Sequence, residues 1–500
     1  MTEDDTKVIQ FNGDALTGPQ VLAIAREHLP VTIGGDAKQA IVQARVTVES
    51  RLESGVPTYG INTGFGALST KTISKEECTT LQLNLLRSHA ASVGEPLEEE
   101  IVRGMMALLA ASLCRGNSGV REVVVTTIVS LLNNNIIPVI PSRGSVGASG
   151  DLSPLAHLAL VLCGEGEAFV DGKQMSGQEA LDKSDIEKIV PQAKEGLALI
   201  NGTHLMCATA ALALSDIASI CEHAVIATAM SIDAAKATGT FLDDRIHAAR
   251  GQSGQRTVAE TIRKLLEGSE ILSSHAEDDP RVQDPYSFRC APQVLGASME
   301  AIARVTGVVQ AELGAVTDNP LVFSEEDDII SGGNFHGMPL AIAMDELRIS
   351  ICHIAGIAER RIEWLLSGRD IHNELPPFLA KNAGVESGLM IAQYTAAACC
   401  AELRTLSMPA SVSNISTSAG IEDYNSMGAT AGFMLRQSIE LCKQVIAIEL
   451  LVSSDALDFY APLQSGAGVE NMRAKVRSLV PERNSDRSPS PDIAKIVKLI

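Results

Sequence analysis

The chain has 500 residues, of which 45% are hydrophobic and 20% charged, so it is far too apolar to remain disordered. It has 40 Lys and Arg against 61 Asp and Glu, a formal net charge of −21. This excess of negative charge excludes a general electrostatic attraction to nucleic acid or to an anionic membrane surface. An anionic small molecule would therefore need a local Arg or Lys to hold it.

The first part of the chain is predicted to be mixed in secondary structure. Apolar residues at helical spacing predict helices over residues 16–27, 36–55, 76–91 and 98–114. Residues 136–150 include two prolines and three glycines, which exclude a regular helix. An apolar helix is predicted next, over 154–163, followed by a β-hairpin over 164–177 whose turn is Asp171-Gly172.

From about residue 201 onward the pattern is helical. Long helices are predicted over 205–235, 293–316, 335–366, 387–406 and 426–451. The third of these carries a stripe of apolar residues at helical spacing, namely Ile351, Ile354, Ala355, Ala358, Ile362, Leu365 and Leu366. Only 3% of residues are aromatic, so small aliphatic side chains must fill a core of closely packed helices.

These patterns predict a mainly α protein. We expect a mixed α/β N-terminal domain over residues 1–200 that carries irregular polar loops. A long-helix bundle with a C-terminal helical region is expected over residues 201–500. Long helices with so few aromatic residues favour a bundle, and such a bundle can be shared between subunits.

The remaining composition indicates a soluble cytoplasmic protein. The N-terminal MTEDDTKVIQ lacks the basic-then-apolar order of a secretory signal. Apolar runs such as 123–132 are well short of the ~20 residues that a bilayer span needs. None of the ten cysteines falls in a C-x-x-C pair, so we expect reduced thiols and no metal site.

Polar, irregular segments that interrupt the helices are rich in groups that chemistry could use. They are residues 59–66, 144–151, 282–289 and 332–336, together with 422–427. The second resembles a phosphate cradle, but it has neither the G-x-x-x-x-G-K-[ST] nor the G-x-G-x-x-G spacing. Any one segment alone is equally well explained as a connecting loop. Together they offer phenols, carboxylates, amides and an Arg, which are the groups that an amino acid site requires.

Ala148-Ser149-Gly150, within GSVGASGDLSPLAH at 144–157, resembles the signature of the histidine and aromatic amino acid ammonia-lyases. Other segments are similar to that family in family order: YGINTGFG (59–66), NLLRSHAA (84–91), EGLALINGT (195–203), VQDPYSFRC (282–290), TDNPL (317–321), SGGNFHG (331–337) and LPPFL (375–379). The resemblance implies the helical fold of the fumarase and aspartase superfamily. The G-S-S-x-M-P-x-K-x-N loop of the dicarboxylate lyases is absent from the sequence.

The resemblance implies a prosthetic group made from the chain itself, 4-methylideneimidazol-5-one, with no external cofactor. In its formation the Gly150 nitrogen attacks the Ala148 carbonyl carbon, and two waters are lost, one of them from the Ser149 side chain. Small residues suit a bent loop, and the serine supplies the hydroxyl that leaves. Read locally, Ser149 could instead be an ordinary cap of the following helix.

The resemblance also implies site residues. Tyr59 is the expected base or proton relay, and Tyr286, on a mobile loop, is expected to be a second. Arg289 is expected to bind the substrate carboxylate, which would also answer the repulsion caused by the net charge. Further expected members of the site, for orienting the substrate or lining the prosthetic group, are Asn201, Gln283, Asn334 and Phe335. A homotetramer whose active sites are shared between subunits is implied as well.

The choice of substrate depends on fewer residues. Ser88-His89 follows the pattern of the histidine enzymes, and Glu422 stands where phenylalanine and tyrosine enzymes tend to have Gln. A carboxylate can bind or deprotonate an imidazole N–H, whereas beside a phenyl ring it would be a desolvated charge without a partner. The segment also departs from the histidine pattern, since Ile421 precedes Glu422 and Tyr424-Asn425 follows Asp423. We expect conversion of histidine to urocanate, with a phenylalanine or tyrosine ammonia-lyase, or an aromatic 2,3-aminomutase, as alternatives.

Overall fold

The computed structural model describes residues 8–277, 279–370, 372–373 and 375–500. The chain divides into two compact units. The first contains Met1–Leu212, Thr306–Asp345 and Pro409–Phe433, and the second contains Ala213–Val305, Glu346–Met408 and Met434–Ile500. The first unit therefore adds two later segments to the N-terminal part of the chain.

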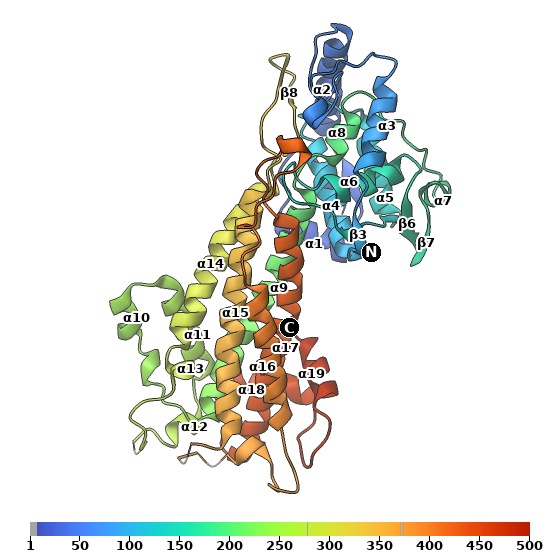
Figure 1. Cartoon of the computed structure of the whole chain (residues 1–500). Coiled ribbons are helices and arrows are strands. Elements are labelled where there is room, and N and C mark those ends of the chain that lie inside the picture. Colours follow the sequence, from blue (N-terminus) through green and yellow to red (C-terminus); the bar gives the residue numbers. More distant parts are fainter. Residues whose placement is uncertain (1–7, 278, 371, 374) are drawn as a thin grey trace, which may run out of the picture. The chain divides into compact units, whose positions relative to one another are not determined.

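The N-terminal part of the first unit is helical, with small sheets at its edges (Figure 1). Its helices are α1 (Gly18–Arg26), α2 (Gly35–Glu53), α3 (Cys78–His89), α4 (Glu99–Leu113), α5 (Glu122–Asn133), α6 (Leu152–Leu162), α7 (Gly177–Asp182) and α8 (Glu195–Ile200). Helix α4 is buried from Ile101 to Leu113 and packs against α1 and α5, while α6 packs against α3 and α8. The packing of α6 fixes the C-terminal end of the loop that precedes this helix.

Four small sheets complete the first unit. Strand β1 (Ile9–Phe11) pairs in parallel with β2 (Val31–Ile33), and the other pairings are antiparallel. They join β3 (Val93–Pro96) to β5 (Pro141–Arg143), β4 (Ile137–Pro138) to β6 (Glu167–Val170), β6 to β7 (Lys173–Ser176), and β8 (Leu321–Phe323) to β9 (Asp328–Ile330). The predicted hairpin is confirmed as β6 and β7. Its turn residues Asp171 and Gly172 have φ of 51° and 73°, as a tight two-residue hairpin turn requires.

The second unit is built on long helices, which confirms the predicted mainly α fold. Four helices supply residues to both units, namely α9 (His204–Ala234), α14 (Ala291–Glu312), α15 (Met338–Ser367) and α17 (Gly428–Leu457). Those within the second unit are α10 (Asp244–Arg250), α11 (Ser253–Leu265), α12 (Glu270–Ser273), α13 (Tyr286–Arg289), α16 (Met390–Leu406), α18 (Ala467–Leu479) and α19 (Ser490–Val497).

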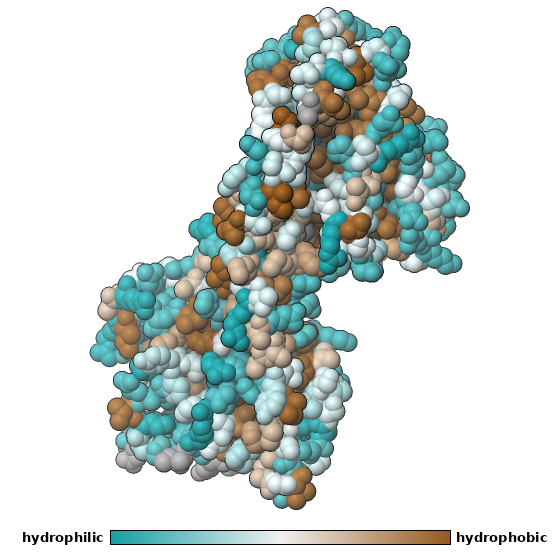
Figure 2. Space-filling model, in the orientation of Figure 1, coloured by the Kyte–Doolittle hydropathy of each residue, from teal (hydrophilic) through white to brown (hydrophobic). Residues whose placement is uncertain are grey.

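The core of the second unit lies between these long helices. The predicted apolar stripe of α15 is buried throughout, and its five residues from Ile351 to Ile362 are 0% exposed. Side-chain bonds join α15 to α16 through Glu359 and Gln393, and α16 to α17 through Cys399 and Gln444. Figure 2 shows apolar residues interspersed among polar ones on the molecular surface.

Helix α9 has the length and hydropathy of a membrane-crossing helix. However, 67% of its most apolar window is buried inside the protein. Its residues from Leu205 to Ala213 include seven with exposures of 4% or less in the first unit: Leu205, Met206, Cys207, Ala208, Ala210, Ala211 and Leu212. A long apolar helix that is buried in this way is explained by packing in a protein core.

Candidate active site

The loop before α6 is pressed against the segment that follows α8. Gly150 has φ of 73°, in the left-handed region that favours glycine. A Cβ added to Gly150 would lie 2.0 Å from the carbonyl oxygen of Gly202, and the Asp151 N–H donates to that same oxygen at 2.7 Å. No residue larger than glycine fits at position 150 without moving the backbone.

A second set of contacts holds the other side of this loop. The N–H of Met427 donates to the Val146 carbonyl at 2.8 Å, and the Ser426 hydroxyl donates to the Gly147 carbonyl at 2.8 Å. The Gly337 N–H donates to the Gly147 carbonyl at 3.3 Å. These bonds bring the segment that carries Glu422 and the segment that carries Phe335, both distant in sequence, to the Ala148-Ser149-Gly150 loop.

Ser149 and Glu422 are in direct contact. The Ser149 hydroxyl donates to Oε1 of Glu422 at 2.7 Å, and the Thr417 hydroxyl donates to Oε2 at 3.0 Å. A short antiparallel bridge between Thr417 and Glu422 fixes the backbone at this point. Both carboxylate oxygens therefore have partners, and one partner is the hydroxyl of the signature serine.

Ser149 borders two cavities of the first unit. The larger, of about 440 Å³, is lined by Tyr59, Gly66, Ser69, Ala148, Ser149, Asn201, Asn319, Ser331, Phe335, His336, Ile421, Glu422, Asp423 and Tyr424. The smaller, of about 190 Å³, is lined by His89, Glu422 and residues from 144 to 153. Six of the residues expected from the sequence thus meet at the larger cavity, and His89 lies at the smaller. The larger cavity falls in the size range of small-molecule sites, roughly 300–1,000 Å³.

The described lining of the larger cavity is acidic. It includes the carboxylates Glu422 and Asp423, and none of its residues is Lys or Arg. A negatively charged group that entered it would find amides, hydroxyls and a ring, but no cation. The lining by itself is therefore suited to the amine and ring of an amino acid and not to the carboxylate.

Tyr59 is held at the cavity as a protonated phenol. Its ring meets Phe65 edge to face with 6.3 Å between ring centroids, and its hydroxyl oxygen accepts from the Gly66 N–H at 3.4 Å. Burial raises the pKa of Tyr59, the Gly66 bond opposes that rise, and the charge of Glu422 adds to it. A base made from this phenol needs a cation that the cavity lining does not supply.

His89 closes helix α3 beside the smaller cavity. Its Nδ1 lies 3.0 Å from the Ser88 hydroxyl, which donates to the Leu85 carbonyl at 3.1 Å. Burial lowers the pKa of His89, while the Leu85 carbonyl and the charge of Glu422 act in the opposite direction. The neutral imidazole is therefore the favoured form near pH 7.

Sequence reasoning missed a buried acid beneath the loop. Asp151 is 0% exposed and accepts from the Met206 N–H at 3.0 Å and the Ser145 hydroxyl at 2.9 Å. Burial raises the pKa of Asp151 to about 7 despite these bonds. His204 lies two residues before Met206, whose N–H donates to Asp151. Burial lowers the pKa of His204 to about 4, and neither of its ring nitrogens has a partner among the described residues. No local sequence pattern distinguishes Asp151 from an ordinary helix-capping aspartate.

The expected amides Asn201 and Asn334 differ in their hydrogen bonding. The buried Oδ1 of Asn201 lines the larger cavity and has no hydrogen-bond partner among the described residues. Nδ2 of Asn334 donates to the Val316 carbonyl at 3.4 Å, and Asn334 lines neither cavity. Asn319 and His336, which the sequence analysis did not single out, do line the larger cavity. Both belong to segments that resemble the ammonia-lyase family, so the resemblance located the right segments but did not identify these two residues as part of the cavity lining.

The remaining expected residues, Gln283, Tyr286 and Arg289, belong to the second unit. None of the three lines either cavity of the first unit. Tyr286 is 70% exposed, and the Arg289 guanidinium lies 4.5 Å from the centroid of its ring. Nε of Arg289 donates to the Asp284 carbonyl at 3.0 Å. The structure therefore brings Tyr286 and Arg289 together, with the Tyr286 ring exposed and Arg289 partly buried, and Gln283 is exposed on the same segment.

Comparisons with known proteins identify the family of the chain and its fold. Residues 16–478 match the model of a family described as aromatic amino acid lyase. A histidine ammonia-lyase of Koribacter versatilis is 46% identical over 506 residues, covering 99% of this chain and 98% of the relative. The crystal structure of histidine ammonia-lyase from Trypanosoma cruzi is similar with a TM-score of 0.91 and 39% identity, covering 99% of this chain and 93% of that one. The phenylalanine aminomutase of Pantoea agglomerans has a TM-score of 0.93 and 31% identity, covering 98% of each chain.

Proposed function

The chain belongs to the aromatic amino acid lyase family, and from that premise we propose that it eliminates ammonia from L-histidine to give urocanate. Membership confirms the family, the carbon–nitrogen lyase class and the mainly α fold that were predicted from the sequence. Several relatives named as histidine ammonia-lyases are 42–46% identical over nearly the whole chain, which supports this substrate.

The observation that carries the substrate assignment is the place of Glu422. Its carboxylate lines both cavities and contacts the hydroxyl of Ser149 at 2.7 Å. An imidazole N–H of bound histidine can donate to this carboxylate, and the neutral His89 offers a second polar partner. Once the Ser149 hydroxyl has been lost, a phenyl ring in the same place would leave Oε1 of Glu422 without a partner, at a cost of about 1–3 kcal/mol.

We propose that Ala148-Ser149-Gly150 cyclises to 4-methylideneimidazol-5-one. The residues present fit this group: Gly150 has the positive φ and lack of Cβ that a tightly bent loop needs, and Ala148 is 4% exposed. The unpartnered Oδ1 of Asn201 faces the same cavity and is available to a ligand. When formed, the group supplies an electron-poor alkene that accepts the substrate amine and makes it a better leaving group.

We propose that two tyrosines of the chain, Tyr59 and Tyr286, take part in proton transfer. Tyr59, whose pKa is raised by burial, holds a proton at its hydroxyl and serves as relay or acid while the site holds no cation. Tyr286, whose ring centroid lies 4.5 Å from the Arg289 guanidinium, is proposed as the second proton-transfer residue on the family resemblance. The roles of Gln283, Asn334 and Phe335 in orienting substrate are proposed on the family resemblance.

The acidic cavity requires a cation for the substrate carboxylate, and we propose that Arg289 of another subunit provides it. A guanidinium binds a carboxylate bidentately, and Arg289 already has its Nε fixed by the Asp284 carbonyl. This assignment agrees with a homotetramer with shared sites. We further propose that the enzyme works in the cytoplasm on a free amino acid, without nucleic acid or membrane partners and without a metal.

The test is an ultraviolet assay of the purified chain with L-histidine, L-phenylalanine and L-tyrosine supplied separately. Urocanate, cinnamate and coumarate absorb differently, so the spectrum identifies the product. We expect urocanate from histidine. Turnover of phenylalanine or tyrosine in place of histidine would move the assignment to the alternative ammonia-lyases. Formation of a β-amino acid would identify an aminomutase, the activity named for the similar Pantoea protein.

A further inference from the structure

Helix α13 carries Tyr286 and Arg289 but cannot set its own position. It has four residues and is closed by the Cys290 N–H, which donates to the Tyr286 carbonyl at 2.9 Å. A helix of one turn is unstable on its own, because a single turn of bonds does not offset the loss of backbone entropy. The orientation of the exposed Tyr286 and the partly buried Arg289 must therefore come from what the short helix contacts.

Three contacts hold α13 from the protein side. Phe288 is 0% exposed, and the Asp284 carboxylate just before the helix accepts from the Thr238 N–H at 2.9 Å. The third is polar and comes from the bundle core: Nη1 of Arg361 donates to the Ser287 carbonyl at 3.2 Å. Ser287 lies between Tyr286 and Arg289, so this last bond acts at the middle of the helix.

Arg361 is itself fixed on two sides. Its side chain and that of Glu449 are both 0% exposed, with Nε to Oε1 at 2.5 Å and Nη2 to Oε2 at 3.0 Å. The Ser231 hydroxyl donates to Oε1 of Glu449 at 2.7 Å, so α9, α15 and α17 all contribute. The planar guanidinium therefore has two of its nitrogens on Glu449 and the third aimed at Ser287.

A stability role does not explain this pair well. Removing two charges from water is costly, and hydrophobic residues of similar volume often replace a buried ion pair without loss of stability. Such residues could not donate to the Ser287 carbonyl. Lysine could not do so either while keeping both bonds to Glu449, because its charge is a single point and not a planar fork.

We propose that Arg361, held by Glu449, is a positioning residue that sets the orientation of α13 and thereby of Tyr286 and Arg289. It contacts neither substrate nor prosthetic group and acts through the Ser287 carbonyl. The inference rests on the proposed function in one respect, since it takes Arg289 to bind the substrate carboxylate. The position of α13 itself can be measured without any substrate.

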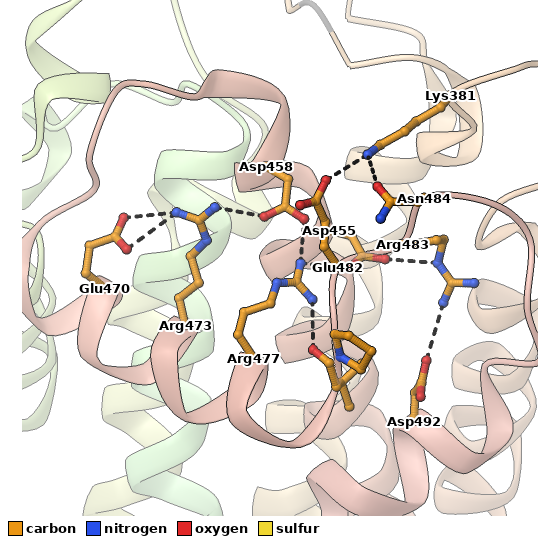
Figure 3. Close-up of polar contacts among 12 residues, drawn as sticks. Lys381, Asp455, Asp458, Glu470, Arg473, Arg477, Glu482, Arg483, Asn484 and Asp492 are labelled. Atoms are coloured by element: carbon orange, nitrogen blue, oxygen red, sulfur yellow. Dashed lines mark hydrogen bonds and ion pairs between the residues drawn. The ribbon is translucent and has the colours of Figure 1, made fainter.

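The experiment uses the full-length enzyme with Arg361→Met and Glu449→Leu combined, so that no charge is left buried alone. A matched control is Arg483→Met, which removes a buried arginine from Asp455 on the same helix α17, in the network of Figure 3. We expect hydrogen exchange of the Cys290 amide to be at least about tenfold faster in the double variant and unchanged in the control. Unchanged exchange in the double variant would overturn the proposal.

Kinetics give the second readout. The double variant should raise KM for L-histidine about tenfold or more, with a smaller change in kcat, while the control stays within about twofold. Adding Arg289→Lys to the double variant should then cost less than about twofold, because Arg289 is already misplaced. Effects that multiply would overturn the proposal. If the double variant does not fold, Arg361→Lys alone should give the same two results.

Different results would reject the proposed role of Arg289 in substrate binding and the proposed role of Arg361 in positioning α13. If Arg289→Lys in the otherwise natural chain leaves KM unchanged, the proposed role of Arg289 is wrong. The exchange rate at Cys290 still reports whether Arg361 positions α13. Conversely, a KM effect of Arg289→Lys without faster exchange in the double variant keeps the proposed function and rejects the inference.

Discussion

The two regions that carry the site residues expected from the sequence are built in opposite ways. The loop around Ala148-Ser149-Gly150 is held on two sides. The Gly202 carbonyl lies against it on one side, and on the other the Ser426 hydroxyl and the Met427 N–H donate to carbonyls of the loop. The segment around Tyr286 and Arg289 is a single helical turn on which the Tyr286 side chain is exposed and the Arg289 side chain is partly buried. The first region is held by contacts on two sides, whereas the second leaves the Tyr286 side chain open to solvent.

The difference extends to charge. The enclosed region contains the acids Asp151, Glu422 and Asp423, and its described cavity lining contains no Lys or Arg. The segment around Tyr286 carries Arg289. The binding of an anionic substrate that we propose needs this arginine in addition to the enclosed region. The following substitutions test whether the two regions have the separate roles that we propose.

The largest effect is expected at Ser149. Ser149→Ala removes the hydroxyl that leaves when the electrophile forms, and we expect turnover to fall by at least about a thousandfold with little change in packing. The natural chain should weigh two waters less than its sequence, and the variant should not show that loss on intact mass measurement. Ser112→Ala, a buried serine of α4 away from the cavities, is the control. A natural chain of unmodified mass would contradict the proposed electrophile.

The next largest effect should follow from Arg289→Met. Loss of a charge-assisted partner of the carboxylate costs about 2–5 kcal/mol, so kcat/KM should fall at least thirtyfold or so. Subunits of this variant, refolded together with Ser149→Ala subunits, should regain activity, because mixed oligomers contain some sites with both natural residues. Mixtures no more active than the Arg289→Met variant alone would show that sites are not shared between subunits.

Glu422→Gln should lower kcat/KM for histidine by about tenfold to a hundredfold, the value of one hydrogen bond to a charged group. An amide at this position no longer discriminates against an uncharged ring, so activity toward phenylalanine should fall less or rise. The ratio of the two substrates, measured in the same ultraviolet assay, is the decisive quantity. Full histidine activity in the variant would remove the main support for this substrate.

The smallest effects concern stability and pH around the enclosed loop. Asp151 ionises near pH 3.9 when unfolded, and its folded pKa is raised to about 7. The folded state binds that proton more tightly, so its stabilising contribution is complete below about pH 4 and is lost as pH rises to 7. For His204 the folded pKa is lowered to about 4, so stability is complete above about pH 6.5 and is lost as pH falls toward 4.

Denaturant titrations between pH 4 and 8 test both signs. Asp151→Asn should flatten the loss of unfolding free energy toward pH 7, and His204→Leu should flatten the loss toward pH 4. The full pKa differences correspond to at most about 4 kcal/mol for Asp151 and about 3 kcal/mol for His204. Identical pH profiles for both variants and the natural chain would contradict the burial effect on these two groups.

The elements that follow from local pattern were predicted well. The long helices α9, α15 and α16 agree with the sequence to within three residues at each end. Helix α14 ends at Glu312, four residues before its predicted end, and α17 extends to Leu457, six residues beyond. Periodicity shows that an amphipathic helix exists, but its ends depend on capping and on contacts made by distant segments.

The site was predictable to the extent that motif segments carry its residues. Tyr59, Ser149, Asn201, Phe335 and Glu422 were placed by resemblance, and the structure brings them to one cavity. Asp151 and Arg361 could not be found this way, since their significance comes from complete burial and from bonds to residues far away in the sequence. Burial of a charged group is a tertiary property that no local pattern contains.

The hydrogen bond from Ser149 to Glu422 has a practical consequence for preparations of this enzyme. In a chain whose serine is intact, the carboxylate that should receive the substrate ring is already engaged by the loop's own hydroxyl. Under the proposed cyclisation such a chain has no reactive alkene, and its Ser149 hydroxyl competes with the ligand for Glu422, so it would contribute little to either turnover or binding. The measured activity would then be proportional to the fraction of chains in which the loop has cyclised. A titration with a tightly binding ligand should give the same fraction.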